Sequence, residues 1–266
     1  QEAKTINMAI DIYTYCTVEE IDEDCIYLEA PAVKLNKKIS NLDEYLADKE
    51  NHSDFIYPHL KYFKPSKCKI YFHSESPIGG GLGGSSSLTI SILKAVSTFC
   101  GKELKDPHEM VRLAHNMEAF LLKTPTGTQD YYPPILGGAL SIDYLWDGHH
   151  FESLQVATDY IEKHFMLVYT GSPHHSGMNN WAVLKDLIED NKQTYQDLEI
   201  LNKISHKLYD VIVSKDWSKM PELFKEEYVA RTSLSPAFTN ERIQSLEKIA
   251  KDHGAEAVKI CGAGGG

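Results

Sequence analysis

Residues 76–87 read SPIGGGLGGSSS, and this stretch indicates both the fold and the chemistry of the chain. Five glycines and three serines take eight of its last nine positions, between an extended apolar segment and a helical one. A glycine-rich turn from a strand into a helix leaves backbone N–H groups open to an anion, and the helix N-terminus adds a partial positive charge. The stretch therefore predicts a binding site for a polyphosphate.

The same stretch fits neither of the two common phosphate-binding patterns. A P-loop needs a lysine after its glycines, and the dinucleotide pattern G-x-G-x-x-G fits only when it is read loosely. An isolated glycine cluster is also compatible with a flexible surface turn. Leu82, inside the glycines, favours an anchored loop, and the serines at 85–87 are placed to cap the helix and to offer hydroxyls to a metal ion.

The composition argues against several classes of protein. A formal net charge of −11 opposes nonspecific binding to DNA, RNA or anionic membranes, so phosphate must be bound locally. The five cysteines are odd in number and form no CxxC pair, which argues against a disulfide framework and a zinc site. No apolar run approaches the about 18–20 residues of a membrane span, and no signal peptide opens the sequence, so we expect a cytoplasmic protein.

Hydrophobic periodicity predicts two successive α+β units, 1–160 and 161–266. In the first we expect strands within 4–21, at 67–74 and at 137–145, and helices at about 85–100 and 107–122. In the second we expect strands at 164–171 and 255–262, and helices within about 179–232 and at 239–253. Both ends stop abruptly, which suggests a fragment of a longer chain.

Glu118 is a candidate metal ligand because of its place on a predicted helix. Val111, Ala114, Leu121 and Leu122 lie at offsets of −7, −4, +3 and +4 from it, so its carboxylate falls on the apolar stripe. A charge is expensive there unless it has a partner. An ion pair with a lysine would satisfy it, and so would a Mg²⁺ ion in a cleft.

The segment PIGGGLGGSSS resembles the second motif of the GHMP kinases, a superfamily that includes galactokinase, homoserine kinase, mevalonate kinase and phosphomevalonate kinase. The motif is usually written P-x-x-x-G-L-G-S-S-A-A, and its matching positions here are Pro77, Gly81, Leu82, Gly83 and Ser85. Gly84 stands where the family has the first serine of its pair. The resemblance implies that ATP binds along Pro77, Gly79, Gly80, Gly81, Leu82, Gly83, Gly84, Ser85 and Ser86, and that Ser85 and Glu118 bind Mg²⁺.

The closing CGAGGG at 261–266 resembles the third motif of the same superfamily, which places Gly262 and Gly264 near the nucleotide and the substrate. The resemblance implies a two-domain α+β architecture, with an N-terminal domain like ribosomal protein S5 domain 2 and a C-terminal ferredoxin-like α/β sandwich. On this basis residues 1–160 lack the first motif of the N-terminal domain, and residues 161–266 end within the third motif.

Asp130 lies in TPTGTQDYYPPILGG at 124–138, where an ordinary loop aspartate is one interpretation. The segment also resembles the G-x-x-D-Q loop of galactokinase and other sugar kinases, with Gly127, Gln129 and Asp130 in register. Those relatives place a metal-binding glutamate at the same interval upstream. The resemblance implies that Asp130 is the catalytic aspartate and that Gln129 contacts substrate. Tyr131 replaces the usual glutamine as a further candidate contact.

Two other polar side chains are open to more than one interpretation. His174, in the loop after the predicted strand at 164–171, is either a substrate contact or a solvated loop residue. Arg231 either contacts a phosphate of the substrate or ends its helix, where cations are favoured.

The resemblance implies an ATP- and Mg²⁺-dependent kinase that phosphorylates a hydroxyl of a small sugar or sugar phosphate. The heptose-7-phosphate kinase branch, which acts on the anomeric hydroxyl, is the most similar. An isoprenoid-pathway kinase is the alternative enzyme, and a catalytically silent nucleotide or sugar sensor is the alternative outside enzymes. We expect neither nucleic acid nor membrane as a partner, and the resemblance leaves a homodimer open.

Overall fold

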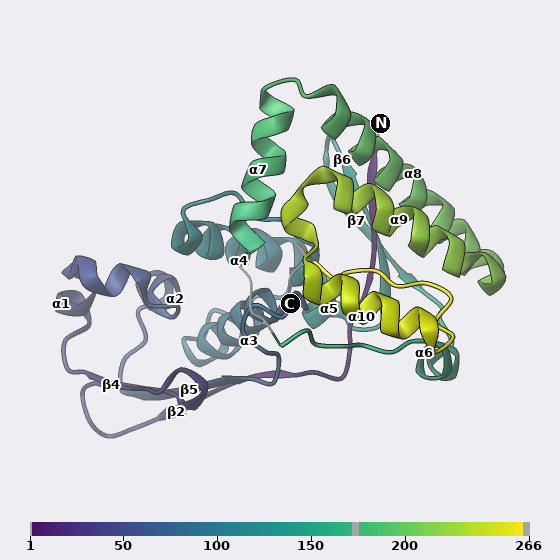
Figure 1. Ribbon diagram of the computed structural model, residues 1–266. Coiled ribbons are helices and arrows are strands. Elements are labelled where there is room, and N and C mark those ends of the chain that lie inside the picture. The colour runs from purple at the N-terminus through teal and green to yellow at the C-terminus, as the bar shows by residue number, and fades with distance from the viewer. Residues whose placement is uncertain (1, 172–175, 263–266) are drawn as a thin grey trace. The chain divides into compact units, whose positions relative to one another are not determined.

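The computed structural model describes residues 2–171 and 176–262, and it confirms the predicted α+β class (Figure 1). The chain divides into two compact units that are not simple halves of the sequence. Unit 1 comprises residues 1–9, 78–82 and 137–266, and unit 2 comprises residues 10–77 and 83–136. The predicted domain boundary at 160 stays a prediction.

Unit 2 contains a four-stranded sheet in the order β2-β5-β3-β4. β2 (Thr14–Glu20) runs antiparallel to β5 (Cys68–Ser74), which runs parallel to β3 (Ile26–Ala30), and β4 (Leu35–Ile39) closes the sheet antiparallel to β3. Alternate residues of the two central strands are buried, as expected for a sheet with one covered face. The buried members are Ile26, Leu28, Ala30, Cys68, Ile70 and Phe72.

Two long helices of unit 2 agree with their predicted positions. α3 (Gly84–Phe99) packs on β2 and on α4 (Pro107–Leu122), and both bury an apolar stripe. Asp106 caps α4 by accepting a hydrogen bond of 3.1 Å from the His108 N–H, with Pro107 at the first helical position. Shorter helices accompany them: α1 (Leu42–Ala47), α2 (Tyr57–Phe63) and α5 (Tyr132–Leu136).

Unit 1 contains an antiparallel sheet in the order β1-β6-β7, formed by β1 (Ala3–Met8), β6 (Ala139–Leu145) and β7 (Gly148–Leu154). α8 (Lys192–Ser214) packs along β1 and beside α9 (Met220–Leu234) (Figure 1). The buried Lys4 ammonium joins sheet and helix, because it pairs with Asp143 at 2.7 Å and lies over the ring of Tyr209 in α8. The other helices are α6 (Thr158–His164), α7 (Ser176–Ile188) and α10 (Glu241–Asp252).

The strands predicted at 164–171 and 255–262 are wrong. α6 extends to His164, and neither segment joins a ladder within the described ranges. Both segments have strand-like apolar composition, but a strand forms only where a neighbour satisfies its backbone N–H and C=O groups. Met166, for example, is left 82% exposed.

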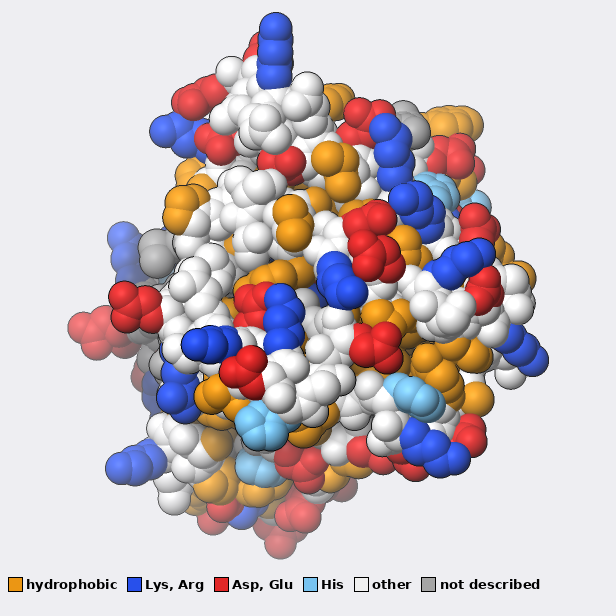
Figure 2. All heavy atoms as spheres, turned by 45° about the vertical axis from the view of Figure 1, so that its right-hand side comes forward, with side chains coloured by type: hydrophobic (Ala, Val, Ile, Leu, Met, Phe, Trp, Pro, Cys, Tyr) orange, Lys and Arg blue, Asp and Glu red, His pale blue; other side chains and the backbone are white. Residues whose placement is uncertain are grey.

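Charged side chains of both signs are interspersed over the face drawn in Figure 2. Ion pairs one turn apart also occur along the helices, such as Lys251 with Glu247 at 2.6 Å and Lys203 with Glu199 at 3.1 Å. Among the residues that the structure describes, no helix is both long and apolar enough to cross a membrane.

His59 of α2 makes the stability of the fold sensitive to acid. Its ring is fully buried, and burial lowers its pKa from 6.5 to about 4. Between these values the unfolded chain binds a proton that the folded chain excludes, so the free energy of unfolding falls as the pH falls. Between pH 7.5 and 4.5, we expect the free energy of unfolding to decrease by about 2–3 kcal/mol less in His59→Gln than in the parent, as measured by urea unfolding. Equal pH dependence in the two proteins would contradict this.

Candidate active site

The glycine-serine stretch has a backbone that requires glycine. Gly79, Gly81 and Gly83 have φ values of 70°, 74° and 67°, in the left-handed region that residues with a Cβ rarely adopt. Gly83 is the N-cap of α3, and its carbonyl accepts the first helical hydrogen bond, from Ser87 N–H at 2.9 Å. The stretch thus leads directly into the N-terminus of a 16-residue helix, which favours anions.

Gly84 has a different reason to be glycine. A Cβ at this position would lie 2.7 Å from Ser76 Oγ and 2.8 Å from Ser76 Cβ, closer than real Cβ contacts allow. Ser76 therefore occupies the space that a side chain at 84 would need. This contact gives a physical reason for glycine where the family motif has serine.

Gly84→Ala should destabilise the protein by about 1–3 kcal/mol, because it overpacks the contact with Ser76. Adding Ser76→Gly should restore most of the stability, because it removes both clashing atoms. Urea unfolding of the two single variants and the double variant would measure the coupling. A Gly84→Ala protein as stable as the parent would show that this segment shifts freely.

Glu118 of α4 is the centre of a hydroxyl cluster. Its side chain is only 7% exposed, and the structure shows no ion pair to it within the described ranges. Its Oε1 accepts a hydrogen bond of 2.6 Å from Ser85, and its Oε2 accepts one of 2.9 Å from Ser86 and a short one from the Tyr131 hydroxyl. The sequence allowed either an ion pair with a lysine or a bound Mg²⁺ ion at Glu118. The described residues place no cationic side chain in an ion pair with this carboxylate.

The three serines of the motif have different partners. Ser87, which follows the two serines on Glu118, shares a hydrogen bond of 2.8 Å with Thr14 Oγ1 of β2. Thr14 also shares one of 2.7 Å with Ser91, one turn further along α3. Ser85 and Ser86 thus serve the Glu118 carboxylate, whereas Ser87 attaches α3 to the sheet.

Asp130 lies beside the N-terminus of α3. A Cβ at Gly83 would be 3.0 Å from Asp130 Cβ and 3.2 Å from its Cγ, so the glycine leaves room for this side chain. Burial raises the pKa of Asp130, the negative charge of Glu118 raises it further, and a hydrogen bond from Gln129 partly opposes these effects. The two carboxylates are therefore close enough for their charges to interact, and Asp130 lies beside Gly83 at the helix terminus.

Tyr131 is buried beneath the surface, next to Glu118. Its side chain is 0% exposed, and its hydroxyl donates to Glu118. Burial and the Glu118 charge raise the pKa of Tyr131 above its ordinary value, which keeps the hydroxyl protonated as a donor. The predicted substrate contact through Tyr131 has no exposed atom to support it in this structure.

The described part of the third motif meets the second motif within unit 1. A Cβ at Gly262 would lie 2.8 Å from the Gly81 carbonyl oxygen, so the two glycine segments are in close contact. Arg231 donates to the Gly262 carbonyl at 3.4 Å and pairs with Glu227 at 2.6 Å, which supports a structural interpretation of this arginine. His174 and Gly264 lie outside the described residues.

The donor set suits Mg²⁺. Carboxylate and hydroxyl oxygens are hard ligands, and proteins commonly hold this ion with one or two carboxylates together with substrate phosphates. A cage of several protein ligands is not required, and the described residues contain no cluster of three or more His, Cys, Asp or Glu side chains that could form one. Glu118 Oε1 and Ser85 Oγ are the fitting pair.

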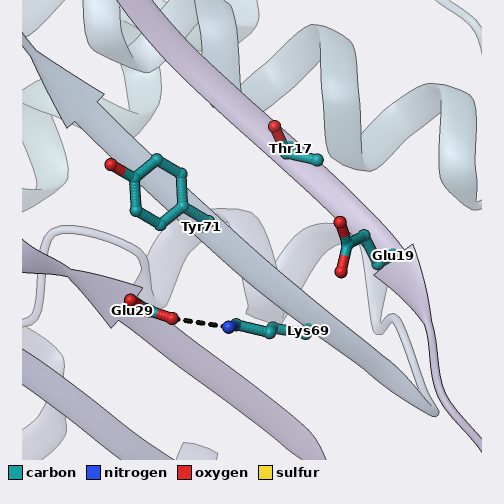
Figure 3. A pocket seen from close by; sticks show the side chains of 5 residues that line it. All are labelled: Thr17, Glu19, Glu29, Lys69 and Tyr71. Carbon is teal, nitrogen blue, oxygen red and sulfur yellow. Dashed lines mark ion pairs between the residues drawn. The ribbon is translucent and has the colours of Figure 1, made fainter.

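Figure 3 shows a hollow on the sheet of unit 2 that includes no residue of the Glu118 cluster among those that line it. It is lined by Thr17, Glu19, Glu29, Lys69 and Tyr71. Thr14 of β2 contacts α3, and side chains alternate along a strand, so Thr17 and Glu19 point to the opposite face of the sheet. Lys69 and Glu29 pair across it at 2.6 Å, which satisfies both charges.

Sequence patterns located most of the cluster but missed two of its supports. Ser76 and Thr14 belong to no recognised motif. Only the structure shows that Ser76 contacts Gly84 and that Thr14 shares a hydrogen bond with Ser87. The partner of the Tyr131 hydroxyl was also missed. The only sign of it in the sequence was an aromatic residue, Tyr131, directly after the proposed catalytic aspartate.

Comparison with known proteins finds similarity to kinases. Residues 53–138 match the family described as GHMP kinases N terminal domain. The chain is 24% identical to D-glycero-alpha-D-manno-heptose 7-phosphate kinase of Campylobacter jejuni, over 98% of this chain and 78% of that protein. It is 26% identical to mevalonate kinase of Pyrococcus abyssi, over 98% of this chain and 79% of that protein.

A solved structure shares the fold. The crystal structure of a D-glycero-D-manno-heptose 1-phosphate kinase from Bacteroides thetaiotaomicron superposes with a TM-score of 0.73 at 20% identity, covering 99% of this chain and 78% of that one. The chain therefore has the α+β fold of the solved kinase structures that it resembles. Residues 53–138 match a GHMP kinase N-terminal domain, and the chain is similar to kinases over nearly its whole length.

Proposed function

We propose that this protein is an ATP- and Mg²⁺-dependent kinase that transfers the γ-phosphate to a hydroxyl of a sugar or sugar phosphate. One observation carries the proposal. The Asp130 carboxylate packs against Gly83 at the N-terminus of α3, and the Glu118 carboxylate is bonded to Ser85 in the first turn of the same helix. A proton acceptor, a metal ligand and a phosphate-binding helix end thus share one place in unit 2.

Each group has a role that its chemistry supports. The N–H groups at the start of α3 hold phosphate oxygens, as helix N-termini do. Glu118 and Ser85 would hold Mg²⁺, which supplies charge neutralisation at the β- and γ-phosphate oxygens. Asp130 orients the acceptor hydroxyl and accepts its proton as the phosphoryl group is transferred.

The acceptor we favour is the anomeric hydroxyl of a heptose 7-phosphate or a related sugar phosphate. The loop at 127–130 supports this choice by its resemblance to sugar kinases, and so does the similarity to the Campylobacter jejuni heptose kinase. A second candidate acceptor is the alcohol of mevalonate. It is supported by the matches to archaeal mevalonate kinases, which cover as much of the chain.

A panel of acceptors tests the proposal. The full chain would be assayed for ADP release and phosphoryl transfer from Mg²⁺ATP to D-glycero-D-manno-heptose 7-phosphate, galactose, fucose and mevalonate. We expect the heptose phosphate to give the highest kcat/KM and a product phosphorylated at the anomeric position. A preference for mevalonate would contradict the proposed sugar phosphate acceptor but support the proposed kinase activity. Failure of all acceptors, together with failure to bind ATP, would contradict the kinase itself.

A further inference from the structure

The two oxygens of the Glu118 carboxylate lie in different surroundings. Oε1 accepts from Ser85, whose side chain is exposed, at 2.6 Å. Oε2 accepts from Ser86 at 2.9 Å and from the Tyr131 hydroxyl, and both of these residues are buried. One oxygen of the carboxylate therefore faces the accessible side of the cluster, whereas the other is enclosed by two hydroxyl donors.

Two donors on one oxygen restrict the carboxylate strongly. A glutamate side chain has three rotatable bonds, and the hydroxyls reach Oε2 from two elements, Ser86 on α3 and Tyr131 in the short turn Gln129–Tyr131 before α5. The tyrosine ring is fully enclosed, so its hydroxyl cannot follow a moving carboxylate. Carboxylates that bind metals are commonly held in this way by further hydrogen bonds.

We propose that Ser86 and Tyr131 clamp Glu118 Oε2 so that Oε1 and the Ser85 hydroxyl face the Mg²⁺ ion, which makes Tyr131 a positioning residue for the metal ligand. The inference rests on the proposed function, since it assigns a role within the same site. It also replaces substrate contact as the role of Tyr131. A phenol suits the task, because it offers one donor to an oxygen on a rigid ring.

The alternative is that Tyr131 only satisfies its own buried hydroxyl. Both roles predict a change in stability when the hydroxyl is removed, but only the clamp predicts a change in metal affinity. Tyr132 provides a matched control, because it is equally buried and adjacent in sequence, and its hydroxyl lies 3.2 Å from His108 Nδ1. Tyr132→Phe removes the same atom from the same kind of surroundings.

The experiment measures Mn²⁺ binding by electron paramagnetic resonance, with an unhydrolysable ATP analogue and the full chain, without turnover. We expect Tyr131→Phe to weaken Mn²⁺ binding by about 10-fold or more, the usual effect of losing a hydrogen bond to a metal ligand. Tyr132→Phe should change it by less than about threefold. In a Glu118→Gln background, Tyr131→Phe should have no further effect, because the clamp acts through that carboxylate.

Equal Mn²⁺ affinity in Tyr131→Phe and the parent would overturn the positioning role and leave the kinase proposal standing. A parent that binds no Mn²⁺ with the analogue would overturn both. If Tyr131→Phe does not fold, as judged by circular dichroism, Ser86→Ala removes the other donor to Oε2. An unchanged Mn²⁺ affinity in Ser86→Ala would then overturn the clamp, and a loss of about 10-fold would support it.

Discussion

Asp130→Asn is expected to lower kcat by about 10²–10⁴-fold, the usual contribution of a general base, while ATP affinity changes by less than about threefold. The asparagine keeps the shape of a side chain that packs against Gly83, but it cannot accept the proton of the acceptor hydroxyl. Single-turnover phosphoryl transfer, measured by rapid quench with the acceptor identified in the panel, separates this loss from slow product release.

The size of the loss distinguishes two roles for Asp130. A loose phosphoryl-transfer transition state needs orientation and charge neutralisation more than a strong base, so a loss near 10² would indicate that Asp130 mainly orients the hydroxyl. Asp147→Asn is the matched control, since it makes the same chemical change in an exposed turn between β6 and β7. An Asp130→Asn rate within threefold of the parent would show that the aspartate is only a turn residue.

Local signals in the sequence were sufficient to predict the helices that carry the site. α4 begins where Asp106 and Pro107 predict, because capping and the restricted φ of proline act within one turn of the chain. α3 begins at Gly84, one residue from its predicted start, because three glycines before it have φ values that end an extended segment. These features depend on neighbouring residues alone.

Pairing between distant segments could not be read in the same way. The apolar run at 164–171 has the composition of a strand, yet it pairs with no other strand within the described residues. In contrast, β3 and β4 were not predicted, although they pair with each other and β3 pairs with β5. Strand formation depends on neighbours far away in sequence, and hydrophobic periodicity carries little information on them.

The candidate site shows the same limit at the level of single side chains. The apolar stripe predicted that Glu118 lies on the buried face of its helix. Resemblance of the glycine motif implied that Ser85 binds Mg²⁺ beside ATP, and resemblance of the loop at 127–130 implied that Asp130 is the catalytic aspartate. The sequence left two possible partners for the Glu118 carboxylate, a lysine or a metal ion. In the structure, three hydroxyl groups donate hydrogen bonds to it. Those hydroxyls come from two segments whose meeting depends on the packing of α3, α4 and the turn at 129–131.

The last prediction concerns the metal ligand. Glu118→Gln should raise the Mg²⁺ concentration for half-maximal activity by about 10–100-fold, because a neutral amide oxygen is a poorer ligand for a hard cation than a carboxylate. The amide is nearly isosteric, its oxygen can accept from the two buried hydroxyls, and its NH2 can donate to the Ser85 hydroxyl, so the fold should persist in circular dichroism and thermal melting. Glu109→Gln, an exposed change on the same helix, is the control and should leave the Mg²⁺ requirement unchanged. Initial rates over a range of free Mg²⁺ at fixed ATP make the measurement. An identical Mg²⁺ requirement in the Glu118→Gln protein and the parent would mean that this carboxylate joins α3 and α4 through its hydrogen bonds and holds no metal.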